Sequence, residues 1–143
     1  MQYDLETANI SLDLFGSTKS KLIDDKITET RETPFLLMLR ASSSAKNFLV
    51  SKRARSVTIF VGKGNNGEDG LCLAALLKIE NIKTHIIDLD NKSRSNSHAY
   101  RLCVDLGVKI EKYSGKKIPK SDWYVDALFG IGLNRDVQGD YLT

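Results

Sequence analysis

The run GKGNNGEDG, from Gly62 to Gly70, follows directly on the β-branched and aromatic run VTIFV, from Val57 to Val61. An apolar run bounded by glycines is typical of a strand that is covered on both faces. In an open parallel sheet, the loop after such a strand presents backbone N–H groups and the N-terminus of the next helix to a ligand. This stretch therefore predicts a strand, a binding loop and a helix in direct succession.

The segments on either side continue the alternation of helix and strand. Upstream, Thr33 and Pro34 predict a helix start, since threonine caps a helix and proline suits its first position, and the apolar periodicity runs to Ser51. Strands that alternate with helices at this spacing imply a parallel sheet with right-handed crossovers, so the fold class is α/β. Downstream, the pattern predicts helices over 71–79 and 95–106 and strands over 84–89, 108–110 and 123–128.

Composition sets the broad class of the protein. The 143 residues suit one domain, 1–143, with 1–20 as an N-terminal extension or short helix. The net charge of +3 is too small to indicate a nucleic-acid partner, and no apolar stretch is long enough to cross a membrane, so we expect a cytoplasmic protein. Cys72 and Cys103 have neither the spacing of a zinc site nor that of a disulfide framework, and are expected to be packed thiols.

The glycine-rich run fits a dinucleotide loop in spacing but not in charge. Gly62, Gly64 and Gly67 satisfy GxGxxG, and an aspartate, Asp88 or Asp90, follows about twenty residues on, whereas the Lys-Ser or Lys-Thr pair of a Walker loop is missing. Two carboxylates in the first helical turn, Glu68 and Asp69, would repel a phosphate on the helix axis. The two asparagines at the tip, Asn65 and Asn66, carry oxygens that suit a hard cation. The run thus predicts either a site for a ligand together with a metal ion, or a glycine turn whose acids cap the helix.

A second loop follows the last predicted strand. It runs from Asp126 to Gly139. We expect it to approach the glycine-rich run, because the carboxyl ends of parallel strands share one edge of the sheet. Asp126 lies within an apolar run, where a carboxylate needs a cation or a hydrogen-bond partner, although it also fits a turn aspartate. Arg135 is either a bidentate phosphate ligand or a solvated loop residue.

Three stretches together resemble the NAD(P)H-hydrate epimerase family, also called the YjeF N-terminal domain. They are GNNGEDG from Gly64, VDALFGIGL from Val125, and LMLRA from Leu37, and they occur in the family's order. The resemblance implies a Rossmann-like three-layer αβα sandwich with a mostly parallel sheet, usually dimeric. It also implies interconversion of the R and S epimers of NADHX and NADPHX, the hydrated forms of the reduced nicotinamide cofactors, for repair by a fused or separate dehydratase.

The resemblance also assigns roles to residues of this chain. Asn66 and Asp126 would hold a potassium ion. The substrate would be contacted by two groups of residues, Asn65, Asn66, Gly67, Glu68 and Asp69 in the first loop and Gly130, Ile131, Gly132, Leu133, Asn134, Arg135 and Asp136 in the second.

Three features depart from the family pattern. Glu68 stands where the family has a second glycine, and Leu39 replaces a glutamate. No stretch matches the family's Asp-Ile-Pro-Ser-Gly-like segment, whose aspartate is its general acid or base. We therefore expect a domain that is incomplete at its C-terminus, and no catalytic residue is assigned.

Two other functions compete with the epimerase. A non-catalytic ligand- or RNA-binding dimerisation scaffold of the same fold would explain Glu68 and Leu39, but it has no need of Asn66 and Asp126 as cation ligands. An ordinary NAD-dependent dehydrogenase needs a catalytic histidine or lysine at a strand end, and the two histidines, His85 and His98, fall within a predicted strand and a predicted helix.

Overall fold

The strand predicted at Val57 lies at the centre of a parallel sheet. The computed structural model describes residues 34–90 and 93–130, which all belong to the compact unit 33–143. The other unit, 1–32, includes the predicted extension 1–20 and lies outside the described residues. Four strands pair in the order β3-β2-β1-β4, and every pairing is parallel, which confirms the predicted α/β class. In chain order the elements are α2 (Pro34–Ser51), β1 (Ser56–Val61), α3 (Asn65–Ile79), β2 (Lys83–Asp88), α4 (His98–Asp105), β3 (Lys109–Lys112) and β4 (Trp123–Ala127).

The order in which the chain adds strands to the sheet reverses beside β1, although all the strands run parallel. From β1 the chain proceeds through β2 to β3 on one side, and then crosses to β4 on the other side of β1. Val61 pairs with Asp88 of β2 and with Ala127 of β4, so three strands end together. In open α/β sheets, ligands bind where the strand order reverses, outside the carboxyl ends of the strands. That point lies between β1 and β4.

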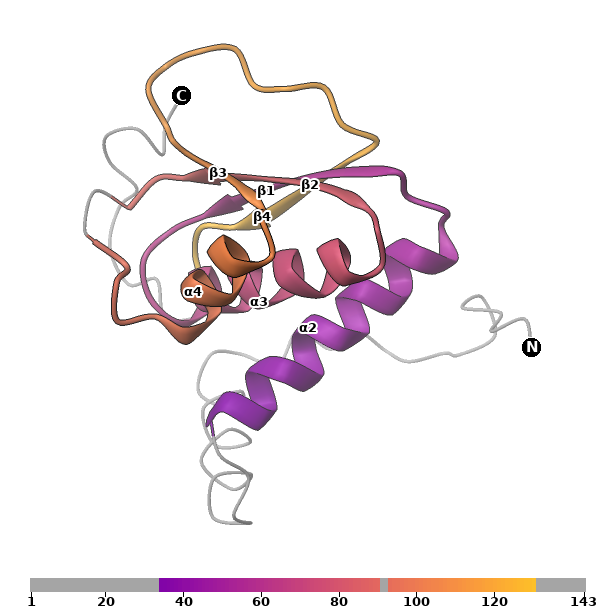
Figure 1. Ribbon diagram of the computed structural model, residues 1–143, viewed down its shortest axis with the longest axis horizontal. Helices are drawn as coiled ribbons and strands as arrows, with labels where there is room; N and C mark the ends of the chain where they lie inside the picture. The colour runs from indigo at the N-terminus through magenta and orange to yellow at the C-terminus, as the bar shows by residue number, and fades with distance from the viewer. Residues whose placement is uncertain (1–33, 91–92, 131–143) are drawn as a thin grey trace. The chain divides into compact units, whose positions relative to one another are not determined.

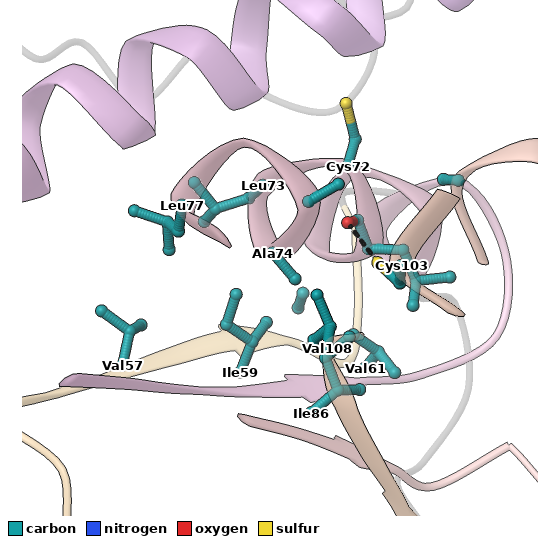
Figure 2. Packing of buried hydrophobic residues seen from close by; sticks show 14 of the residues in the cluster. Val57, Ile59, Val61, Cys72, Leu73, Ala74, Leu77, Ile86, Cys103 and Val108 are labelled. Carbon is teal, nitrogen blue, oxygen red and sulfur yellow. Dashed lines mark hydrogen bonds between the residues drawn. The ribbon is translucent and has the colours of Figure 1, made fainter. Parts of the chain in front are cut away.

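Helix α3 covers one face of the sheet, and α2 packs on the far side of α3 (Figure 1). Figure 2 shows Val57 and Ile59 of β1 pointing toward Ala74 and Leu77 of α3, and all four side chains are fully buried. This alternation puts Phe60 on the opposite face, where its ring stacks on Tyr124. The described helices lie on the α3 side of the sheet, and the core lies between that side and α3 (Figure 1).

The predicted helix from Pro34 to Ser51 is confirmed at both ends. Its predicted apolar face is confirmed in part, since Ser42 and Leu49 are buried, whereas Phe35 is 56% exposed. Phe48 is 43% exposed but packs edge-on against Trp123, with 5.7 Å between the ring centroids.

Two other helices differ from prediction at their first residues. Helix α4 begins at His98 rather than 95, because the Ser97 hydroxyl accepts a hydrogen bond from the Tyr100 N–H and caps the helix there. Helix α3 begins at Asn65 rather than 71, so part of the predicted loop is helical. The predicted left-handed conformation after α4 is confirmed at Gly107, whose φ is +67°.

Candidate functional site

The glycine loop, from Gly62 to Gly70, and the loop after β4 meet as predicted. They meet at the switch point, the place between β1 and β4 where the strand order reverses. The Gly62 N–H donates to the Ala127 carbonyl at 3.0 Å, and a Cβ atom on Gly62 would lie 2.1 Å from the Leu128 carbonyl oxygen. No side chain fits between backbones this close. Glycine at 62 therefore allows the two loops to approach each other.

Asn66 joins the two loops through its side chain. Its amide Nδ2 donates to the Phe129 carbonyl oxygen at 2.9 Å, and a Cβ atom on Gly130 would lie 3.5 Å from the Asn66 Cβ. The Asn66 side chain is half-buried, whereas Asn65 and Gly130 are exposed beside it. Of the predicted substrate residues, these three are brought together at the mouth of the switch point.

The first turn of α3 contains residues that were predicted to be loop. Gly64 precedes the helix with φ +85°, which an L side chain rarely adopts. Gly67 is buried within the helix, where a Cβ atom would lie 1.9 Å from the Gly62 carbonyl oxygen. Gly67 thus serves close packing rather than a turn. The helix N-terminus, with its free N–H groups, begins at the candidate site and favours an anion.

Asp69 is a half-buried carboxyl group one helical turn into α3. Burial raises its pKa, and the nearby charge of Glu68 raises it further. Its backbone carbonyl accepts a hydrogen bond from the Ser42 hydroxyl at 3.0 Å, which ties α2 to this turn. A carboxyl group with a raised pKa is suited to proton transfer closer to neutral pH.

Asp126 is exposed, at the end of β4. Its Oδ1 accepts the Leu128 N–H at 2.8 Å, which is the turn interaction that the sequence left open as an alternative. The Asn66 and Asp126 oxygens are ligands that an alkali cation accepts, so the donor types fit the ion implied by the resemblance. Among the described residues, no group of three or more His, Cys, Asp or Glu side chains is arranged to hold a metal ion.

The structure adds Arg94, which no sequence pattern indicates. Arg94 is 8% exposed, and its guanidinium donates to both carboxylate oxygens of Asp88 at 3.1 Å. It also donates to the Gly62 carbonyl at 2.6 Å and contacts Glu68 Oε1 at 3.4 Å. No spacing rule marks this arginine, which lies in a serine-rich segment. Its role follows only from the fold, which brings the ends of β1 and β2 together.

Asp88 is the aspartate that the dinucleotide fingerprint would assign to a ribose. Its carboxylate is 1% exposed and also accepts from Lys112 Nζ at 2.7 Å. Burial alone would raise its pKa, but the hydrogen bonds from Arg94 and Lys112 outweigh burial and lower it. Asp88 is therefore paired within the protein.

The histidines and cysteines lie apart from the junction of the loops. His85 is 3.1 Å from Glu111 on the β2 and β3 strands, and burial lowers its pKa. His98 is exposed on α4. Cys72 and Cys103 are free and buried, which confirms the prediction of packed thiols. Figure 2 shows the Cys103 thiol directed at the Leu71 carbonyl, and burial raises its pKa to about 12.

Several predicted site residues lie outside the described part of the chain. The residues concerned are Ile131, Gly132, Leu133, Asn134, Arg135 and Asp136. Among the described helices, none is long and apolar enough to cross a membrane.

Comparisons with known proteins place the chain among related sequences. Residues 35–143 match the model of the family described as YjeF-related protein N-terminus. An NAD(P)H-hydrate epimerase of Limosilactobacillus fermentum is 32% identical over 76% of this chain and 54% of its own. One from Lentilactobacillus buchneri is 32% identical over 87% of this chain and 61% of its own. The chain thus spans little more than half the length of these curated relatives.

Two further relatives extend the comparison. A protein of Coxiella burnetii named bifunctional NAD(P)H-hydrate repair enzyme Nnr is 27% identical over 90% of this chain and 27% of its own. The crystal structure of yeast ynu0 superimposes with a TM-score of 0.78 at 20% identity, covering 89% of this chain and 60% of that one. This superposition confirms the fold.

Proposed function

This chain belongs to the YjeF-related protein N-terminus family, and from that premise we propose that it is an NAD(P)H-hydrate epimerase. Its substrates would be NADHX and NADPHX, and its product the opposite epimer of each. The observation that carries the proposal is the junction at the switch point, where Asn66 of the glycine loop bonds to Phe129 of the second loop. Both loops carry the stretches that resemble the family.

The proposed binding mode follows from the helix and the two loops. The exposed N-terminus of α3 suits the diphosphate of a dinucleotide. Asn65 and Gly130 border the same junction and would contact the substrate, and the residues from Ile131 to Asp136 would complete the second loop. Asn66 and Asp126 would hold potassium. When bound, that ion supplies positive charge next to the oxygens of the substrate.

The reaction requires a proton donor and acceptor. Loss of the ring hydroxyl as water requires a proton and leaves an iminium cation of the still reduced ring, stabilised by the ring nitrogen. The opposite epimer forms when water adds to the other face and the proton is returned. We assign this exchange to Asp69, a half-buried carboxyl group one helical turn from the N-terminus of α3, whose pKa is raised by burial.

The partners proposed are a dehydratase and a second copy of the chain. The name of the Coxiella burnetii relative describes a bifunctional repair enzyme, which supports a dehydratase that acts on one epimer, either fused or separate. A homodimer remains a proposal of the family resemblance, and a cytoplasmic location remains an expectation from the sequence.

The experiment measures how fast the purified chain equilibrates separated R and S epimers of NADHX, in potassium and in sodium. We expect acceleration over buffer that requires potassium, and Asp126→Ala should remove that requirement together with the acceleration. Asp105→Ala, an exposed carboxylate on α4, is the matched control. Rates equal to buffer contradict the epimerase, and tight NADHX binding without turnover would favour the scaffold function that Glu68 first suggested.

A further inference from the structure

Glu68 occupies the position at which the family has a glycine, yet its carboxylate is not left free in the first turn of α3. One oxygen, Oε1, lies 3.4 Å from Arg94 Nη1, and the other accepts the Ser97 hydroxyl. Both partners belong to the segment between β2 and α4. The added negative charge is therefore held against the body of the domain.

Arg94 connects three segments through one guanidinium group. Its Nη2 donates to the Gly62 carbonyl at 2.6 Å and to Asp88 Oδ1 at 3.1 Å, while Nη1 faces Glu68 at the start of α3. Its side chain is 5% exposed. Only a guanidinium offers donors in this fixed planar fork, and a lysine ammonium could not make the same set of bonds.

The surrounding charges make Arg94 the main cation for Glu68. Asp88 also has Lys112, at 2.7 Å, and Asp90 lies 3.8 Å from Arg94. The only described salt bridge to Glu68 is the one from Arg94. Without Arg94, the Glu68 carboxylate would present its full charge beside the N-terminus of α3.

We infer that Arg94 is a positioning residue for the glycine loop and the first turn of α3, from Gly62 to Glu68. It anchors Gly62 and neutralises Glu68, so that the diphosphate of the substrate can approach the N-terminus of α3. Glu68 and Arg94 thereby form a compensating pair, in which the arginine offsets the charge that replaces the family's glycine. The anchoring part stands on the contacts alone, whereas the part that concerns the diphosphate rests on the proposed function.

The test separates anchoring from charge by using Arg94→Met, Glu68→Gln and the double variant. Anchoring is read from hydrogen exchange of the Gly62 and Glu68 amides, which donate to Ala127 and Gly64. We expect about tenfold faster exchange at both amides in Arg94→Met and in the double variant, with the β1 core unchanged. Arg101→Met, an exposed arginine on α4, is the matched control and should leave exchange unchanged.

The charge effect is read from the dissociation constants of NADHX and of ADP-ribose, a probe that requires no turnover. Arg94→Met should weaken both about tenfold, as expected for loss of an interaction with a charged group. Glu68→Gln in the same background should recover most of that loss, because the repelling charge is gone. A purely structural role for Arg94 predicts no recovery.

Arg94→Lys provides a second variant should the methionine variant fail to fold. It retains the positive charge but not the fork, so we expect faster loop exchange with nearly unchanged affinity. Wild-type exchange rates in the Arg94 variants would overturn the anchoring, and no recovery of affinity in the double variant would overturn the compensation. A wild-type chain that binds neither compound would refute the proposed function, and the exchange rates alone would then decide the inference.

Discussion

The two flanks of β1 are joined to it in different ways at the carboxyl end of the sheet. On the β4 flank, the Gly62 N–H bonds to the Ala127 carbonyl and one side-chain amide, that of Asn66, bonds to Phe129. On the β2 flank, the Leu89 N–H likewise bonds to the Val61 carbonyl, and buried charges centred on Asp88 and Arg94 add charged side-chain links that the β4 flank lacks among the described residues. The first flank leaves the side-chain oxygen of Asn66 without a described hydrogen bond, whereas the second pairs its charges with one another.

The difference teaches where a ligand site can form. Charges that are buried and paired, as Asp88 is, are costly to expose and are poor ligands for a substrate. Backbone-to-backbone contact at Gly62 requires no charge and leaves polar side chains at its rim. The β2 flank therefore holds the glycine loop, and we expect a ligand on the β4 flank.

The largest expected effect is on the β2 flank. Asp88→Asn removes the charge that pairs with Arg94 and Lys112, and breaking a buried pair of this kind costs about 3 to 5 kcal/mol in the free energy of unfolding. Urea denaturation measures the loss, with Asp105→Asn as an exposed control that should change stability little. A loss of less than about 1 kcal/mol, typical of surface pairs, would mean that the β2 flank is not held by these charges.

The next effect tests the close approach of Gly67 to Gly62, the residue that is bonded to both flanks. Gly67→Ala places a Cβ atom 1.9 Å from the Gly62 carbonyl oxygen, so the loop must move, at a cost of about 1 to 3 kcal/mol. Gly130→Ala is the matched control, because its Cβ would make an ordinary contact of 3.5 Å with Asn66. Thermal unfolding of both variants measures the difference. Equal stability of the two would contradict the tight packing at Gly67.

A smaller effect appears with pH. The pKa of Asp88 is lower in the folded than in the unfolded chain, so its contribution is present above its ordinary pKa and is lost as the pH falls through the folded value. The stability difference between the wild type and Asp88→Asn should therefore shrink below about pH 4. Asp69 has the opposite sign, since a raised pKa stabilises the fold at low pH and loses that contribution as the pH rises. A stability difference that stays constant on acidification would show that Asp88 gains nothing from its partners.

Local sequence signals predicted the elements and the meeting of the two loops. The helix from Pro34 to Ser51 has a start signal and a continuous apolar period, and the structure confirms its predicted bounds. The predicted start of α3 is wrong because Gly67 and Gly70, whose residue type favours a turn, lie inside the helix. Both are buried in the helix, where a Cβ on Gly70 would lie 2.6 Å from the Ala127 Cβ, and close packing of this kind depends on contacts distant in sequence.

The charges of the site were harder to predict than its glycines. Asp88 has the spacing of a ribose ligand, and no local sequence pattern indicates that it pairs with Arg94. Glu68 was expected to oppose a phosphate, but Arg94 and Ser97 hold it. Such pairings depend on which strand ends lie side by side, and the order of the strands is not encoded in local periodicity. The assignments of Asn66 and Asp126 to potassium stay predictions.

The smallest expected effect on stability is on the β4 flank and separates joining from binding. Asn66→Ala removes one hydrogen bond, to Phe129, and should lower the free energy of unfolding by about 1 kcal/mol. Asn66→Asp loses the same donor but keeps an oxygen ligand. If Asn66 binds the cation, the aspartate variant retains potassium-dependent binding of NADHX and the alanine variant loses it, although both are similarly destabilised. Binding that falls equally in both variants, measured in potassium and in sodium, would instead make Asn66 only a link between the loops.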